Sequence, residues 1–327
     1  MIIRGSICFV AAAMTAALPL AAAATSVDRE VLDVFGRLGL GVDTNSAARP
    51  VAEALLKAVD PRGRILAAGE EPAAGAGPTV AAAEAWAEGL FYLKLRGLNA
   101  GGATNISESL RGGMKAQPSG LILDLRDAGG DSLDAADALL SMFVEPGTPL
   151  YSLRGAGSSN GPPRTAARAD TRLDGVTCAL IVNEETRDAC ELAAAVLKSL
   201  PDVVALGWQT RGDAGIRTAV ALSGGERLLV ADRWAVPVTG GEYHGRGVKP
   251  DVALTSTSMP DVPVPAPIPG ITREPSERAL GAARMRDRIG GDAALQRACD
   301  LLVGLKALRK TTSAWVPEPA QRPAGSP

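Results

Sequence analysis

The sequence has little histidine, few aromatic residues and no excess of one charge. Aromatic residues make up only 3% of the 327 residues, which argues against stacking platforms for single-stranded nucleic acid. The formal net charge is −2 and no basic stripe occurs, so nucleic acid is not an expected partner. The single histidine, His244, excludes a metal site built from several histidines, and we expect no cofactor. Its glycine-rich surroundings, GEYHGRG, are typical of a solvated turn.

Only one long apolar run occurs, and it lies at the amino terminus. Arg4 precedes the apolar stretch ICFVAAAMTAALPL, which is followed by four alanines that offer cleavage sites. Residues 1–24 are therefore predicted to be an export signal, which places the mature chain in the periplasm or outside the cell. Contact with a membrane would require that this signal stays uncleaved. No later segment is apolar for long enough to cross a bilayer.

Cysteine is scarce as well, and its spacing gives no sign of a disulfide framework. Cys178, Cys190 and Cys299 remain once the signal is removed, and no CxxC pattern occurs. An odd number of cysteines in an exported chain leaves at least one free or paired between chains. The alternative is that all of them are small buried hydrophobic residues.

Hydrophobic periodicity divides the chain into helical ends and a mixed centre. Residues 25–63 carry helical spacing in VDREVLDVFGRLG and AARPVAEALLKAVDP, and the second helix is expected to stop at Pro61. Over residues 85–258, buried strand patterns alternate with helical ones, which favours βαβ units and a mostly parallel sheet. Shorter alternating segments, IRTAVAL, ERLLVA and RWAVPV, predict a small β lobe. The other predicted segments are a flexible linker (64–84), a proline-rich linker (259–275), carboxyl-terminal helices (276–310) and a disordered tail (311–327).

Three stretches of the chain occur in a characteristic order and spacing. They are GLILDLRDAGGDSLDAADAL, VNEETRDACELAAAVL and the segment that runs from GWQTRGDAGIRTAVAL to YHGRGVKPDV. Together they resemble the carboxy-terminal processing, or tail-specific, serine peptidases. The resemblance implies an α/β fold with a crotonase-like core, an amino-terminal helical region and a small β lobe. The family usually inserts a PDZ domain before the core, but here only weakly patterned residues stand in that place, so we expect none.

The family's catalytic positions carry different side chains in this sequence. The resemblance places the nucleophilic serine three residues before Glu191, and this chain has Asp188 there. The position of the general-base lysine, 25 residues downstream, is Asp213, and the glutamine four residues later is Arg217. The resemblance therefore implies that the Ser–Lys dyad of the family is absent.

Other parts of the family's site are present in the sequence. Gly129 and Gly130 match the glycine pair whose backbone amide helps to form the oxyanion hole. Ala189 matches the residue whose amide completes that hole. Asp124 and Arg126 match the DLR residues, and we interpret them as a strand-end pair that holds the glycine turn in place.

Two aspartates at the dyad positions need electrostatic compensation. If the fold is kept, Asp188 and Asp213 lie close together, and two carboxylates in contact cannot both ionise cheaply. Either they share a proton, or a cation separates them. Arg187, Arg211 and Arg217 are the candidate cations.

Three alternatives would keep chemistry at this site. Cys190 could act as a substitute nucleophile, since it lies in the first turn of a helix, where a thiol pKa is lowered. The aspartates could form a dyad that activates water, or could bind Ca²⁺ or Mg²⁺ together with Glu191.

The function favoured by the sequence is binding without catalysis. We expect an exported family homologue without hydrolytic activity that binds a peptide, an unfolded carboxyl terminus or a partner protein. The alternative is an active hydrolase that works through Cys190 or the aspartate pair. Assembly into an oligomer through the carboxyl-terminal helices is a third possibility.

Overall fold

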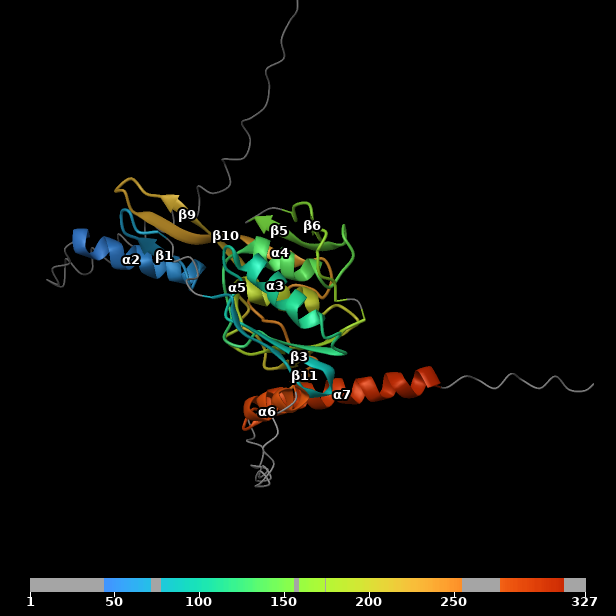
Figure 1. Ribbon diagram of the computed structural model, residues 1–327. Coiled ribbons are helices and arrows are strands. Elements are labelled where there is room, and N and C mark those ends of the chain that lie inside the picture. The colour runs from blue at the N-terminus through green and yellow to red at the C-terminus, as the bar shows by residue number, and fades with distance from the viewer. Residues whose placement is uncertain (1–43, 72–77, 156–158, 174, 255–276, 315–327) are drawn as a thin grey trace, which may run out of the picture. The chain divides into compact units, whose positions relative to one another are not determined.

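The computed structural model describes residues 44–71, 78–155, 159–173, 175–254 and 277–314 (Figure 1). The chain forms two compact units, Met1–Ile65 and Leu66–Pro327. Helix α2 (Thr44–Val59) lies in the first unit and ends before Pro61, as predicted, and strand β1 (Arg64–Leu66) spans the boundary. The predicted export signal, the helix expected before α2 and the proline-rich linker lie outside the described residues.

The second unit is built on a six-stranded sheet that is mostly parallel. The strand order is β11-β8-β7-β4-β3-β2, and only the pairing of β2 with β3 is antiparallel. The register places Leu123 of β4 opposite both Leu93 of β3 and Leu180 of β7. The predicted βαβ organisation is therefore confirmed. The strands are β2 (Val80–Ala85), β3 (Leu90–Leu95), β4 (Gly120–Asp124), β7 (Thr177–Val182), β8 (Val203–Gly207) and β11 (Val252–Ala253).

Helices cover both faces of this sheet, which explains why its central strands are apolar on both sides (Figure 1). In β4, Leu121 and Leu123 pack with one set of helices, whereas Ile122 between them packs on the opposite face. The first set is α3 (Gly102–Met114), α4 (Leu133–Ser141) and α5 (Asp188–Leu197). The other face carries α6 (Glu277–Ile289) and α7 (Ala293–Ala314). The short helix η1 (Ala87–Gly89) comes between β2 and β3 in the chain.

A second, antiparallel sheet forms the predicted β lobe. Within the second unit it contains β5 (Pro149–Gly155), β6 (Arg164–Thr165), β9 (Gly215–Ala221) and β10 (Arg227–Pro237). The segments ERLLVA and RWAVPV, predicted as separate pieces, are one strand, β10, with an irregular register between Ala231 and Arg233. The register shift reverses the alternation of side chains, which is why one strand has the pattern of two.

Two predicted boundaries are wrong. The segment expected to be a flexible linker over residues 64–84 contains β2, which pairs with β3 along the edge of the main sheet. Its small, half-buried alanines give little hydrophobic signal, although they fit an edge strand. The last helix, α7, continues to Ala314 and so extends beyond the predicted limit at residue 310.

Candidate functional site

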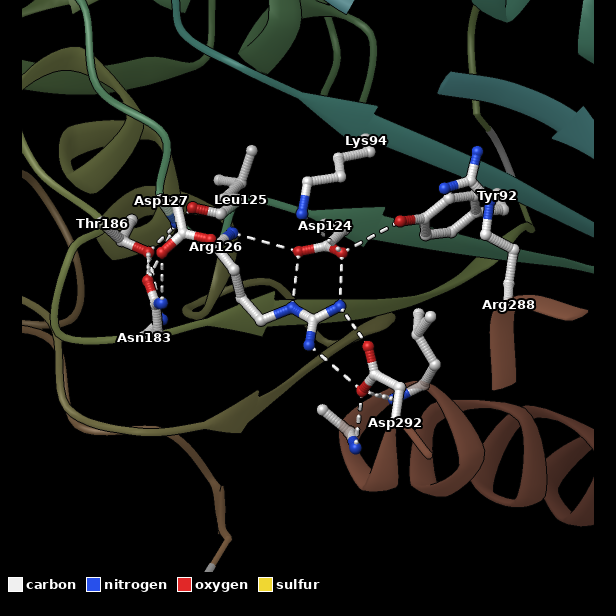
Figure 2. Close-up of polar contacts among 12 residues, drawn as sticks. Tyr92, Lys94, Asp124, Leu125, Arg126, Asp127, Asn183, Thr186, Arg288 and Asp292 are labelled. Carbon is white, nitrogen blue, oxygen red and sulfur yellow. Dashed lines mark hydrogen bonds and ion pairs between the residues drawn. The ribbon is translucent and has the colours of Figure 1, made fainter. Parts of the chain in front are cut away.

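The site is formed where β4 and β7 end and two turns follow them. Thr186 in the second turn donates its hydroxyl to the Leu125 carbonyl at 2.8 Å, and Asn183 donates to the Asp127 carboxylate at 2.9 Å (Figure 2). Asp127 in return donates its backbone N–H to Asn183 Oδ1 at 3.0 Å. These bonds fix the glycine turn against the start of α5. Asn183 was not singled out from the sequence, although it belongs to the second motif, and the structural role of Thr186 was not predicted.

Backbone bonds connect the same turns more closely. The carbonyl of Ala128 accepts from Arg187 N–H at 3.0 Å, and the carbonyl of Gly130 accepts from Ala189 N–H at 2.8 Å. Gly130 has a φ of +103°, and a Cβ there would overlap the Leu98 backbone, so only glycine fits. The Ala189 amide, predicted to be an oxyanion donor, is therefore already occupied in this conformation.

Asp188, predicted to stand at the serine position of the family, begins helix α5. Its φ is 54°, in the left-handed region that non-glycine residues rarely adopt. The preceding residue, Arg187, is extended, so the chain makes a sharp turn from strand to helix at this point. At this turn, only 15% of the area of the Asp188 side chain is exposed. A strained backbone at such a position is common at functional sites.

An arginine joins the two aspartates that are predicted to stand at the dyad positions. Arg217 Nη2 donates to both carboxylate oxygens of Asp213, at 2.9 and 3.2 Å. Its Nη1 lies 3.8 Å from Asp188 Oδ1, and Arg187 Nε lies 3.6 Å from Asp188 Oδ2. The Arg217 side chain is 13% exposed, so solvent screens these charges weakly. The compensating charge is thus a guanidinium, whereas Arg211, the third candidate, pairs with Glu185 outside this cluster.

Glu191 holds the loop that carries Asp213. It is fully buried, and its carboxylate accepts hydrogen bonds from the Thr210 hydroxyl, from Gly212 N–H at 2.5 Å and from Asp213 N–H at 2.8 Å. Burial raises the pKa of Glu191 above its ordinary value, although these donors oppose the shift. Both carboxylate oxygens of Glu191 therefore already accept hydrogen bonds from the loop. In the part of the chain that the structure describes, no group of three His, Cys, Asp or Glu side chains is arranged to hold a metal ion.

Cys190 lies in the interior and not in the cleft. Its side chain is fully buried, and the thiol donates to the Gly129 carbonyl at 2.9 Å. Burial raises the pKa of the Cys190 thiol to about 12. The expectation that the helix start lowers this pKa is wrong, because desolvation of the thiolate outweighs the helix dipole. Cys178 and Cys299 are also buried and free, in agreement with their interpretation as small hydrophobic residues.

Tyr243 is a site residue that the sequence did not reveal. Its side chain is 3% exposed, and its hydroxyl is a buried polar atom that has no hydrogen-bond partner among the described residues. Burial and the charges of Glu191, Asp213 and Asp188 raise its pKa well above the ordinary value. The neighbouring His244 is exposed, as predicted, and its ring lies edge-on to Trp234. One glycine-rich turn thus holds a buried aromatic residue beside a solvated one.

The DLR residues form a buried ion network on the other side of β4 (Figure 2). Arg126 binds Asp124 through Nε at 2.9 Å and Nη2 at 2.7 Å, and it also binds Asp292, which precedes α7, at 2.8 Å. Burial alone would raise the pKa of Asp124, but the hydrogen bonds and charge of Arg126 lower it below its ordinary value. The expected strand-end pair is present, and it also fastens the carboxyl-terminal helix to the sheet.

Comparison with known proteins agrees with this geometry. The sequence profile of peptidase family S41 matches residues 89–254, just over half of the chain. The chain therefore belongs to peptidase family S41, and its core has the ClpP/crotonase-like fold of that family. It is similar to proteins named "Probable CtpA-like serine protease" from Staphylococcus epidermidis, at 27% identity over 158 residues, and Staphylococcus aureus, at 28% over 145 residues.

These matches are partial. They cover 47% and 43% of this chain, and the chain spans about a third of the length of these curated relatives, 32% and 29%. A solved structure from Parabacteroides merdae ATCC 43184 has the same fold with a TM-score of 0.50, at 17% identity, and the match covers 69% of this chain and 82% of that one. No helix within the described ranges has the length and apolar character needed to cross a membrane.

Proposed function

We propose that this chain is a member of peptidase family S41 that binds polypeptide without hydrolysing it. The observation that carries the proposal is the cluster of Asp188, Arg217 and Asp213 at the positions where the family has serine, glutamine and lysine. A Ser–Lys dyad needs a hydroxyl nucleophile and a neutral amine. The cluster supplies neither, because the side chains are two carboxylates and a guanidinium that stays charged at every relevant pH.

The geometry of the amide donors supports the same conclusion. Stabilising an oxyanion requires backbone N–H groups that point at the reacting carbonyl oxygen. The Ala189 N–H donates instead to the Gly130 carbonyl at 2.8 Å. A bound peptide would therefore find neither an attacking group nor this donor of the hole.

The alternative, an active hydrolase that uses Cys190, is opposed by the structure of α5. A thiolate nucleophile needs a lowered pKa and access to substrate. The Cys190 thiol has a pKa raised to about 12, is fully buried and is bonded to the Gly129 carbonyl. We therefore favour binding over hydrolysis.

The expected partner is a peptide, the carboxyl terminus of an unfolded protein, or a folded partner protein. The relatives carry the name "Probable CtpA-like serine protease", and the substrates of a protease are polypeptides. We also propose that the chain acts after export, in the periplasm or outside the cell, because residues 1–24 have the pattern of an export signal.

Binding and cleavage can be tested in one sample. A fluorescein-labelled unstructured peptide with an apolar carboxyl terminus is titrated with the chain, and anisotropy reports binding while mass spectrometry reports the peptide mass. We expect saturable binding with an unchanged mass. Arg217→Gln, which restores the family's residue and removes the shared cation, should change the affinity, whereas the exposed α3 variant Arg111→Gln should not. Constant anisotropy, or a shortened peptide, would contradict the proposal.

A further inference from the structure

A separate cavity lies on the face of the sheet that carries α6 and α7. Its volume is about 650 Å³, within the range of pockets for small organic ligands. Neither the aspartate cluster nor Tyr243 contributes to its lining. We call this cavity the cation-rich pocket. Its charged lining residues are Lys94, Arg96, Arg126, Arg288, Asp127 and Asp292.

The carboxylates near this pocket are already supplied with donors. Asp124, buried behind Lys94, accepts from the Tyr92 hydroxyl at 3.0 Å and from the side chain of Arg126 (Figure 2). Asp292 accepts from Arg126 at 3.1 Å and from two backbone N–H groups at the start of α7. These oxygens therefore have little capacity left for further donors.

Asp127, the remaining acid of the lining, is directed elsewhere. It accepts from Asn183 at 2.9 Å, and Figure 2 shows it beside Asn183 and Thr186. It thus belongs to the contacts that hold the two turns together. It does not neutralise the donors on β3.

Three basic residues of the cation-rich pocket have N–H donors available for a ligand. Lys94 is 28% exposed, and its ammonium approaches Asp124 only at 3.7 Å. The Arg96 side chain is exposed, and no acceptor contacts its guanidinium among the residues that the structure describes. Arg288 binds Glu84 through Nε and Nη2, and its Nη1 takes no part in that pair. An excess of N–H donors over free acceptors is the chemistry of an anion site.

We propose that the cation-rich pocket binds the anionic group, a carboxylate or a phosphate, of a small organic ligand, with Lys94 and Arg96 as the principal contacts. Arg126 and Arg288 would add charge from the strand end and from α6. Arg126 is held in place by Asp124 and Asp292, so the site is preorganised on that side. The ligand would lie against β3 and α6, apart from the polypeptide site proposed above.

The proposal is tested by isothermal titration of the full chain with two probes, inorganic phosphate and succinate. We expect saturable binding of at least one probe that weakens as sodium chloride is added. Arg96→Gln and Lys94→Gln should each weaken that binding about tenfold, the effect of one lost charge-assisted hydrogen bond. Arg111→Gln, which removes an exposed arginine from α3 on the opposite face of the sheet, is the matched control and should bind as the native chain does.

The outcomes separate the two sources of the anion. Binding of phosphate alone identifies a phosphorylated ligand, and binding of succinate alone identifies a carboxylate ligand. Arg96 is exposed, so its variant should fold even if Lys94→Gln does not, and the unfolding transition of each variant checks this. Absence of saturable binding to both probes would overturn the proposal, as would native affinity in Arg96→Gln. Neither result bears on peptide binding at Arg217.

Discussion

The Tyr243 hydroxyl is buried without a partner in the described structure, which has a measurable consequence for stability. Tyr243→Phe removes only that oxygen. Because no described hydrogen bond is lost, we expect the free energy of unfolding to stay the same or to rise by up to about 1 kcal/mol in urea denaturation.

Tyr151→Phe is the matched control for this measurement. Its hydroxyl donates to Asp137 Oδ1 at 2.7 Å, so the same change should cost roughly 1–2 kcal/mol. An equal loss in both variants would show that Tyr243 has a strong partner, such as an internal water, in solution.

Glu191 should make stability depend on pH. Its pKa is raised in the folded state, so the fold holds this proton more tightly than the unfolded chain does. The contribution is fully present below the ordinary pKa of 4.5 and is lost as pH rises through the raised value. We therefore expect the native chain to lose stability relative to Glu191→Gln as pH rises above 4.5 in urea titrations at several pH values.

The Glu191→Gln variant has a second expected effect. An amide cannot accept from both Gly212 N–H and Asp213 N–H while it also meets the Thr210 hydroxyl, so one buried donor loses its partner. The cost at acid pH should be roughly 1–3 kcal/mol. A stability difference between native chain and variant that does not change with pH would refute the raised pKa.

At the scale of elements, the start of α7 is fastened to the sheet through one aspartate. Asp292 accepts from the N–H groups of Ala294 and Leu295, both at 3.1 Å, and binds Arg126. Asp292→Ala removes a helix cap and one carboxylate partner of a half-buried guanidinium. We expect it to lower the free energy of unfolding by roughly 1–3 kcal/mol.

The control for this prediction is Asp287→Ala on α6. Asp287 is exposed, and no side-chain contact is described for it. Its replacement should change the free energy of unfolding by less than about 0.5 kcal/mol. Similar losses in both variants would mean that the link from Arg126 to Asp292 contributes little.

Sequence patterns located the elements better than their limits. The buried strands β4 and β7 were predicted because apolar runs of their length, followed by glycine or polar turns, have few other interpretations. Strand β2 was missed because VAAAEA is made of small residues whose strand character comes from pairing with β3. The continuity of β10 was hidden by the register shift near Asp232, which no local pattern signals.

For the site, the sequence predicted which positions come together but not the contacts that their neighbours make. Spacing identified Asp188, Asp213 and Arg217, and the structure brings all of them together. Spacing could not reveal that the Ala189 amide is occupied or that Cys190 is buried, because both depend on how the two turns pack. Tyr243 was missed because its neighbours, glycines and the exposed His244, are typical of a solvated turn.

At the scale of the whole molecule, the chain has the S41 core, and the resemblance to the tail-specific peptidases implies that aspartates stand at the family's dyad positions. The fold holds α5, the glycine turn and the loop of Asp213 in one arrangement, and fold alone does not determine activity. The cluster of Asp188, Arg217 and Asp213 occupies the positions predicted for the dyad. We therefore propose that this peptidase fold binds polypeptide and leaves it whole.

The most direct test is an end-point proteolysis assay. The chain from Thr25 onward is incubated with an unstructured protein that has an apolar carboxyl terminus, beside matched samples of Asp188→Ala and Cys190→Ala, and fragments are read by mass spectrometry. We predict intact protein in every sample. Cleavage by the native chain that is lost in one of the two variants would contradict the account and would identify the residue that acts as the nucleophile.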